Sequence, residues 1–325
     1  MSENYYPLFL EPIYKDYIWG GDRIKHLFKR PFCPPVCAES WELSDRHDGM
    51  SSVANGLLAG STLNQLVERM QGNLLGSDRT DLTFPLLLKI IDARQRLSVQ
   101  VHPDEQSAKS LGGEAKTEMW YILDAKPGTK VFAGFKKQTD TKTFEQHLKT
   151  NRVEELLNSV EVKTGDSIYI PGGTIHSIGE GCLILEVQQN SNTTYRVYDW
   201  NRVDKTGKPR ELHIKEALKA INWDEDKFFV SKGCEHSQPA GNSIRKLVTS
   251  PYFTVETIVM DKKLHIKNDG KTFHVLFTAS GSVSIEGNSS VQQIPHGATC
   301  LVPAAISDYV LTPTGKKAVV IRISR

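Results

Sequence analysis

A histidine at the end of a turn motif is the first residue of this chain that could bind a metal. The stretch Gly165–His176 follows the pattern G-x5-P-x-G-x2-H. Proline fixes its own φ and glycine tolerates positive φ, so both residues suit a tight turn whatever the function. The histidine has no such local reason to be there. Because a single histidine is more often structural than a ligand, His176 needs partners elsewhere in the chain.

Two upstream segments supply candidate partners. In the sequence LSVQVHPD, strand alternation places the valines on one face and Gln100 and His102 on the other. In KTEMWYIL, the same alternation places Lys116 and Glu118 on one side. Two imidazoles, a carboxylate and an amide oxygen then form one potential ligand set, made of Gln100, His102, Glu118 and His176.

This ligand set has borderline hardness, which suits Zn²⁺ or another divalent first-row metal. Two histidines and one carboxylate also describe the facial triad of non-haem iron oxygenases, so the residues alone leave the metal open. The competing interpretation puts the same side chains on the wet face of half-exposed strands. It requires four independent polar placements to match one metal geometry by chance.

The elements that would position these residues are strands of a small barrel. The motif that ends in His176 resembles the second cupin motif, in which the histidine points into the barrel. Gly297–Asp308 repeats this motif 132 residues later, with Ala305 for the glycine and Asp308 for the histidine. The expected fold is mainly β, with two cupin (jelly-roll) barrels and short helical insertions.

The second copy of the repeat lacks two of the potential ligands. Phe273–Gly281 matches Trp120–Gly128 at an offset of 153 residues, which pairs Lys271 with Glu118. The motif histidine is already replaced by Asp308. We therefore expect a single metal site, in the first barrel, and a degenerate second barrel without metal.

The two offsets differ by 21 residues, which predicts an insertion in the first copy. Thr143–Gln146 has a T-x-x-Q capping-box pattern, and apolar residues recur at helical spacing from Val153 to Val160. A similar T-x-x-Q pattern begins at Thr62. We expect helical insertions at about 62–76, 136–160 and 211–222, within a catalytic domain of residues 1–235 that precedes a second domain of residues 236–325.

Composition is that of a folded protein of two lobes. The chain has 325 residues, a length that exceeds the usual size of a single hydrophobic core. Of these residues 39% are hydrophobic and 24% are charged, which is ordinary for a globular protein. A formal net charge of +2 gives no case for a nucleic-acid or membrane partner. The N-terminus lacks a basic and then apolar leader, and the five cysteines are sparse, so we expect free thiols and a cytoplasmic location.

The motifs together resemble a known enzyme family. QVHPD, KTEMWY and the segment Thr194–Trp200 occur in that order, and the resemblance extends from the Trp19-Gly-Gly segment and Glu39–Ser44 through the second barrel. They resemble type I mannose-6-phosphate isomerase, also called phosphomannose isomerase, in its compact bacterial form. The resemblance implies interconversion of mannose 6-phosphate and fructose 6-phosphate through a cis-enediol.

The same resemblance assigns roles to residues. It implies one Zn²⁺ per chain, with Gln100, His102, Glu118 and His176 as its ligands. It matches Arg196 to the catalytic arginine and Lys116 to a lysine that acts as an acid, a base or a partner of sugar hydroxyls. Glu186 is our expected base, because some family members carry an aspartate where this chain has Asn192, and a neutral amide cannot accept a proton at neutral pH.

Some questions stay open from the sequence. Lys116 or a metal-bound water competes with Glu186 for the role of base. Ser98 and Lys89 are candidates for phosphate binding, but no Gly-rich phosphate loop is present. A non-haem iron oxygenase and a non-catalytic sugar-binding cupin are the alternative functions. The first conflicts with a polar pocket that holds Lys116 and Arg196, and the second has no use for these charged groups.

Overall fold

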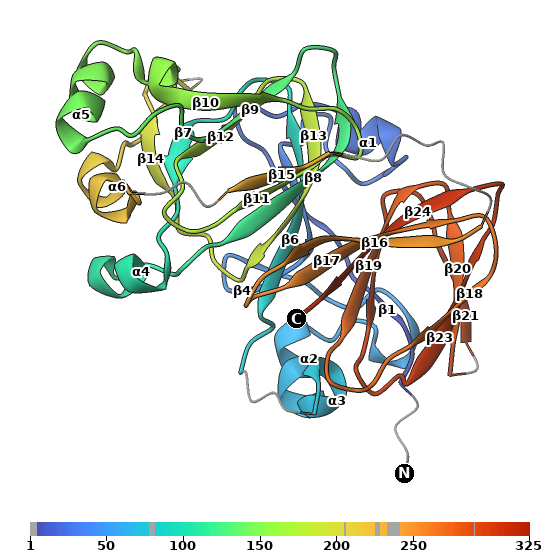
Figure 1. Cartoon of the computed structure of the whole chain (residues 1–325). Helices are drawn as coiled ribbons and strands as arrows, with labels where there is room; N and C mark the ends of the chain where they lie inside the picture. Colours follow the sequence, from blue (N-terminus) through green and yellow to red (C-terminus); the bar gives the residue numbers. More distant parts are fainter. Residues whose placement is uncertain (1–4, 78–81, 205, 225–227, 233–240, 289) are drawn as a thin grey trace.

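Four antiparallel sheets form two barrels that lie side by side (Figure 1). The computed structural model of the chain describes residues 5–77, 82–204, 206–224, 228–232, 241–288 and 290–325. Each barrel consists of one larger and one smaller sheet. The larger sheets of the two barrels pack against each other through a shared apolar core, so the mainly β, doubled fold expected from the sequence is confirmed.

The first barrel combines a seven-stranded and a five-stranded sheet. In spatial order, the larger sheet contains β15 (Phe229–Ser231), β11 (Ser167–Ile170), β8 (Glu118–Ala125), β13 (Cys182–Gln189), β6 (Leu86–Ala93), β3 (Glu39–Leu43) and β2 (Ile13–Lys15). The smaller sheet contains β10 (Leu157–Glu161), β9 (Lys130–Phe135), β12 (His176–Ile178), β7 (Val99–Val101) and β14 (Tyr195–Tyr198). A two-stranded ribbon consists of β4 (Asp45–Arg46) and β5 (Gly49–Met50).

The second barrel combines a six-stranded and a four-stranded sheet. The larger sheet contains β1 (Leu8–Phe9), β22 (Thr299–Val302), β19 (His274–Ser280), β24 (Ala318–Ser324), β17 (Thr254–Met260) and β16 (Ser243–Thr249). The smaller sheet contains β18 (Leu264–Lys267), β23 (Asp308–Pro313), β20 (Val283–Gly287) and β21 (Ser290–Ile294).

Strand alternation decides which side chains enter the first barrel. On β13, Leu185 and Val187 belong to the core between the barrels, so the intervening Glu186 points into the barrel interior. On β6, Leu88 and Ile90 pack into the same core, and Lys89 points inward. Both strands are buried along nearly their whole length, which explains why they read as almost continuous apolar runs.

The two barrels share one topology. The spatial order β11-β8-β13-β6-β3 in the first barrel recurs as β22-β19-β24-β17-β16 in the second. The order β10-β9-β12-β7 recurs as β21-β20-β23-β18. The internal repeat inferred from the motifs therefore corresponds to a duplicated barrel.

The register corrects one residue pairing expected from the repeat. Glu118 stands opposite Ile170, the residue before the motif proline, and His274 stands opposite Val302 at the equivalent place. The counterpart of Glu118 is therefore His274 and not Lys271. The expected pairing was wrong because it aligned the turn glycines Gly128 and Gly281, whereas the stretch from Glu118 to Gly128 is three residues longer than the stretch from His274 to Gly281.

Short helices decorate the barrels. The T-x-x-Q pattern at Thr62 forms a complete capping box with Gln65, as expected. Asp104 forms a second capping box with Ser107, which sequence reasoning missed. The helices are α1 (Arg23–Leu27), α2 (Leu63–Met70), α3 (Gly72–Leu75), α4 (Glu105–Leu111), α5 (Thr141–Lys149) and α6 (Ile214–Ala220), with 3₁₀ turns η1 (Gly56–Leu58) and η2 (Val153–Leu156).

The insertion in the first copy differs in detail from the expectation. Helix α5 begins earlier than expected, because Asp140 rather than Thr143 is its N-cap and accepts a hydrogen bond from the Thr143 N–H. The helical spacing from Val153 to Val160 is only partly realised. It gives one 3₁₀ turn, and the chain then pairs as β10 with β9, because the strand edge offers hydrogen bonds that an isolated turn lacks.

Several contacts tie the N-terminal segment to the second barrel. Strand β1 pairs with β22. The Arg30 guanidinium donates to both carboxylate oxygens of Glu42 in the first barrel and to the Gly297 carbonyl in the second. The division into domains at residue 235 stays a prediction, since residues 233–240 lie outside the described part of the chain.

The cysteines and the helix lengths complete the description. Cys33, Cys37, Cys182 and Cys300 are buried free thiols, and Cys234 lies outside the described residues. Within the described residues, no helix has the length and apolar character needed to cross a membrane.

Candidate active site

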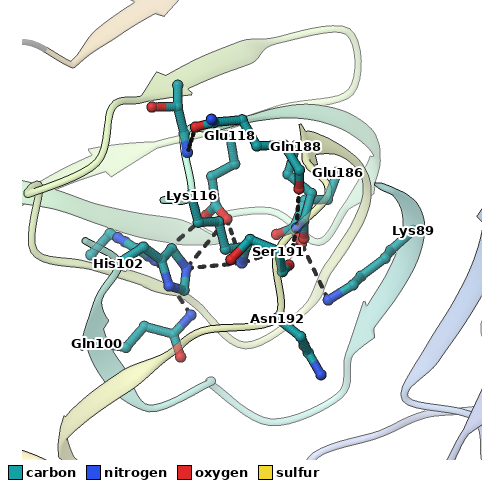
Figure 2. Close-up of polar contacts among 12 residues, drawn as sticks. Lys89, Gln100, His102, Lys116, Glu118, Glu186, Gln188, Ser191 and Asn192 are labelled. Carbon is teal, nitrogen blue, oxygen red and sulfur yellow. Dashed lines mark hydrogen bonds and ion pairs between the residues drawn. The ribbon is translucent and has the colours of Figure 1, made fainter. Parts of the chain in front are cut away.

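Three of the four expected metal ligands converge inside the first barrel, and Figure 2 shows two of them, His102 and Glu118. His102 directly follows β7, Glu118 begins β8 and His176 begins β12. Their potential ligand atoms all lie within 4.8 Å of one another, and all three side chains are buried. The Glu118 carboxylate lies between the imidazoles, 3.3 Å from His102 Nε2 and 3.5 Å from His176 Nε2.

Hydrogen bonds to backbone carbonyls fix the orientation of both imidazoles. His102 Nδ1 lies 2.8 Å from the Thr193 carbonyl, and His176 Nδ1 lies 2.8 Å from the Thr174 carbonyl. A carbonyl only accepts, so each Nδ1 carries the proton and each Nε2 carries the lone pair that a metal could use. In this structure the His102 lone pair accepts from Lys116 Nζ at 2.9 Å and the His176 lone pair from Gln100 Nε2 at 3.3 Å. Burial lowers the pKa of both histidines, that of His102 to about 3, so both rings are neutral near pH 7.

Gln100 lies beside the triad, in register with His176 across β7 and β12. Its Nε2 is 3.3 Å from His176 Nε2, and its Oε1 accepts a hydrogen bond from the Ser98 hydroxyl. A half-turn of the amide would bring the oxygen to a metal held by the triad. The donor set therefore fits a divalent metal, with three ligands in place and Gln100 within reach.

Carboxylates and ammonium groups alternate along the barrel interior, in the order Glu118, Lys116, Glu186, Lys89 and Glu39. Lys116 Nζ lies 2.7 Å from Glu118 Oε2 and 3.8 Å from Glu186 Oε1. Lys89 Nζ lies 3.8 Å from the same Glu186 oxygen and 3.5 Å from Glu39 Oε2. The alternation compensates charges that burial alone would make costly.

The two central carboxylates of this row have opposite pKa shifts. Burial acts to raise the pKa of Glu118, but the charge of Lys116 outweighs it and holds that pKa well below its usual range. Burial and the charge of Glu118 raise the pKa of Glu186 to about 7. Glu186 Oε1 is buried and has no hydrogen-bond partner among the described residues, whereas Oε2 accepts from the Trp120 indole. A carboxylate with one oxygen that accepts no hydrogen bond and a pKa near neutrality suits a general base.

A polar cavity of about 270 Å³ opens above the triad. Lys116 and Gln100 line it, while His102, Glu118 and His176 are not part of its wall. Glu186 reaches the cavity too, so all of the expected catalytic groups border one space. The lining residues are Tyr17, Trp19, Glu39, Lys89, Ile91, Leu97, Ser98, Gln100, Lys116, Glu186, Asn192, Thr194, Arg196 and Arg210.

Two arginines line the same cavity. Arg196, on β14, has a buried Nε without a hydrogen-bond partner among the described residues, and its Nη1 donates to the Glu211 carbonyl. Arg210 donates to both carboxylate oxygens of Asp199, one of them at 2.8 Å. Burial and the nearby charge of Arg210 lower the pKa of Arg196. Two adjacent guanidiniums favour an anion, such as a phosphate or an enediolate.

Sequence reasoning missed several of these lining residues. Glu39 lies in a segment that carried the family resemblance, but nothing in the pattern indicated its ion pair with Lys89. Arg210 follows a loop without any motif. Lys89, a candidate for phosphate, lies between two carboxylates, and Ser98 is hydrogen-bonded to Gln100, so neither side chain is free for that task.

The second barrel has different polar groups at the equivalent positions. Glu186 and Lys89 correspond in register to Arg322 and Glu256, so the ion pair is retained with its charges exchanged. Arg322 donates through Nε and Nη2 to Glu256 Oε2, at 2.9 and 2.6 Å. His274, at the place of Glu118, is hydrogen-bonded to the buried Tyr309 hydroxyl. These groups satisfy one another, and among the described residues only the first barrel holds a cluster suited to a metal.

Comparison with known proteins assigns the chain to a family. Residues 8–148 match the family described as phosphomannose isomerase type I, catalytic domain, and residues 243–322 match the mannose-6-phosphate isomerase cupin domain. A probable mannose-6-phosphate isomerase of Bacillus subtilis, GmuF, is 36% identical over 95% of this chain and 97% of its own length. The chain belongs to the type I mannose-6-phosphate isomerase family.

Further relatives agree with this membership. The mannose-6-phosphate isomerase ManA of Bacillus subtilis is 34% identical over 94% of this chain and 95% of its own length. A crystal structure of the mannose 6-phosphate isomerase from Bacillus subtilis matches with a TM-score of 0.86 and 31% identity, covering 98% of this chain and 99% of that chain. The family resemblance inferred from the motifs is thereby confirmed.

Proposed function

We propose that the protein is a zinc-dependent aldose-ketose isomerase that interconverts mannose 6-phosphate and fructose 6-phosphate through a cis-enediol. The observation that carries the proposal is Glu186, a buried carboxylate with one oxygen that accepts no hydrogen bond among the described residues, in a polar cavity beside the triad of His102, Glu118 and His176. Family membership supports the same reaction and substrate. Free buried thiols are in keeping with a reducing cytoplasm.

The metal would be held by His102, Glu118, His176 and the oxygen of Gln100. Two neutral imidazoles with two oxygen donors suit Zn²⁺. A bound Zn²⁺ would polarise the carbonyl of the open-chain sugar or orient its oxygens. The carbonyls that fix the two histidine rings support this assignment, because such partners are usual around ligating histidines.

Glu186 is the proposed base. Starting from the open-chain aldose, its carboxylate takes the proton from C2, the C2 electron pair forms the C1–C2 double bond, and the C1 carbonyl oxygen gains a proton. The resulting cis-enediol then loses the proton of its C2 hydroxyl and receives a proton at C1, which gives the ketose. A pKa of about 7 lets Glu186 both accept and return that proton near neutral pH.

Lys116 and Arg196 would manage the charge that develops on the oxygens. Lys116 Nζ lies near both Glu118 and Glu186, so it can donate a hydrogen bond to the oxygen that gains a proton. Arg196 offers an unpartnered Nε–H toward an anion, in line with stabilisation of an enediolate. Arg210, fixed by Asp199, is the proposed contact of the phosphate group.

Metal analysis combined with a coupled assay tests this proposal. The purified protein should contain about one zinc per chain and form fructose 6-phosphate from mannose 6-phosphate, and a chelator should abolish turnover until zinc is restored. Glu186→Gln should lower kcat about 10²- to 10⁴-fold with metal retained. Glu154→Gln, at an exposed carboxylate paired with Arg96, is the matched control and should leave kcat unchanged.

Three results would count against parts of this proposal. Isomerisation that persists in the metal-free protein would reject the role of zinc. Near-normal turnover of Glu186→Gln would transfer the role of base to Lys116 or to a water. Oxygen uptake coupled to loss of substrate would favour an oxygenase, which the isomerase relatives argue against.

A further inference from the structure

Asn192 lines the cavity (Figure 2), and its side chain is hydrogen-bonded to a carboxylate, that of Asp48. Its Nδ2 donates a hydrogen bond to Asp48 Oδ2 at 2.7 Å. Asp48 lies in the turn between β4 and β5, far from Asn192 in the sequence, and is not among the residues that line the cavity. This contact therefore reaches the cavity only through Asn192.

The partner decides how the Asn192 amide is turned. Partial burial acts to raise the pKa of Asp48, but the hydrogen bond from Asn192 and the charge of Arg46 outweigh it and lower that pKa. Asp48 is thus a carboxylate that only accepts hydrogen bonds, so Asn192 must present its NH₂ group to it. The carbonyl oxygen of the amide is then left to accept a hydrogen bond.

Further contacts hold this arrangement in place. The Asn192 backbone N–H donates to Glu114 Oε2 at 3.2 Å. Arg46 bridges the two carboxylates, with Nε 3.1 Å from Asp48 Oδ1 and Nη1 2.9 Å from Glu114 Oε2. The Lys15 ammonium donates to the Asp48 carbonyl at 2.7 Å. Backbone and side chain of Asn192 are therefore both fixed by one charged network.

We propose that Asn192 binds a hydroxyl of the open-chain sugar through its amide oxygen, and that Asp48 is the positioning residue that turns this oxygen toward the substrate. The inference rests on the proposed sugar-phosphate substrate, since it names a contact of the same cavity. In this proposal the neutral Asn192 amide binds the sugar and transfers no proton, whereas an aspartate at this position could transfer one. The Asn192 amide oxygen thus adds one hydrogen-bond acceptor to a cavity wall whose charged groups are mainly donors.

A double-mutant cycle on the zinc-loaded full chain tests the pair. Asn192→Ala should raise the KM for mannose 6-phosphate about three- to tenfold, the usual range for one hydrogen bond, with kcat within about twofold. Asp48→Ala should have the same effect by releasing the amide. The double variant D48A/N192A should be no worse than either single variant, because both remove one interaction. Asp124→Asn, at a half-exposed carboxylate that pairs with Arg23, is the control and should match the wild type.

Exchanging the two partners adds a rescue experiment. Asn192→Asp alone brings two carboxylates into contact and should raise the KM more than Asn192→Ala does. The exchange D48N/N192D restores a hydrogen bond between an amide and a carboxylate, with an oxygen still facing the cavity, and should recover most of the loss. A purely structural role of Asp48 would instead lower the melting temperature while the KM of the folded enzyme stays normal, and that result overturns the proposal.

Binding separates this inference from the proposed function. The Kd of fructose 6-phosphate is measured by calorimetry for the wild type, D48A and N192A. Weaker binding by both variants supports the pair even if the wild type were to lack isomerase activity, which would overturn only the proposed reaction. Equal Kd values in all three proteins overturn the pair, and absence of binding to the wild type overturns both proposals.

Discussion

Ionisation of Glu186 should oppose the stability of the metal-free protein, and the substitution Glu186→Gln should remove that penalty. Burial and Glu118 raise the pKa of Glu186 to about 7, from 4.5. A difference of one pKa unit corresponds to about 1.4 kcal/mol, so this difference amounts to about 3 kcal/mol of unfolding free energy. The side chain is 4% exposed, so solvent screening reduces this figure little.

The sign of the effect follows from which state binds the proton. Below pH 4.5 the carboxyl is protonated in both states and contributes nothing. Between pH 4.5 and about 7 the native state keeps the proton that the unfolded state has lost, so the unfolding free energy falls as pH rises. The glutamine variant has no proton to lose. Its stability relative to the wild type should therefore increase by about 3 kcal/mol across this range.

Urea denaturation of the chelator-treated proteins at about pH 5, 6, 7 and 8 measures this difference. Tryptophan fluorescence is a suitable signal, because the Trp120 indole donates to both Glu118 and Glu186. Only the pH dependence is diagnostic, since removing the carboxylate also costs a neighbour of Lys116 at every pH. The control Glu154→Gln should show no pH-dependent difference. If the unfolding free energies of Glu186→Gln and the wild type changed with pH in parallel, the reasoning would be refuted.

Two further predictions concern the arginines. Arg210→Met should raise the KM for mannose 6-phosphate about 10- to 100-fold with little change in kcat, because a charge-assisted contact to phosphate is worth about 1.5–3 kcal/mol. Steady-state kinetics with unphosphorylated mannose should show no such difference, and an equal loss with both sugars would contradict a phosphate contact. Arg30→Met should lower the unfolding free energy by about 3 kcal/mol, since it leaves the buried Glu42 without its cation. Urea denaturation measures that loss, and normal stability, or a kcat that falls in the folded variant, would contradict a purely structural role of Arg30.

The candidate metal cluster could be inferred from the sequence because its geometry is encoded locally. Gln100 and His102 share a strand face by alternation, and the turn before β12 sets His176 at the start of a strand. The supporting residues were out of reach for the opposite reason. Asp48 and Arg210 reach the cavity only through the tertiary fold, and neither lies in a pattern that links it to the ligands.

The fold was predictable to a similar extent and for similar reasons. Turn residues and apolar alternation revealed the duplicated barrel, since both recur in each copy. The register between strands depends on turn length and on bulges, which motif matching does not measure, and so the counterpart of Glu118 was misplaced at Lys271. Helix α5 begins at Thr141 because Asp140 caps the Thr143 N–H, whereas a cap at Thr143 would have used the Gln146 N–H, and both residue types are good N-caps.

The pairing of β1 with β22 limits how the chain can be divided. Leu8 and Phe9, near the N-terminus, pair with the outer edge of β22 in the second barrel. A fragment cut between the barrels would leave that strand as an open edge, and would also expose the apolar face through which the two large sheets meet. Such edges invite aggregation. The first barrel should therefore be expressed, permuted or recombined only together with the second barrel, which covers its apolar face.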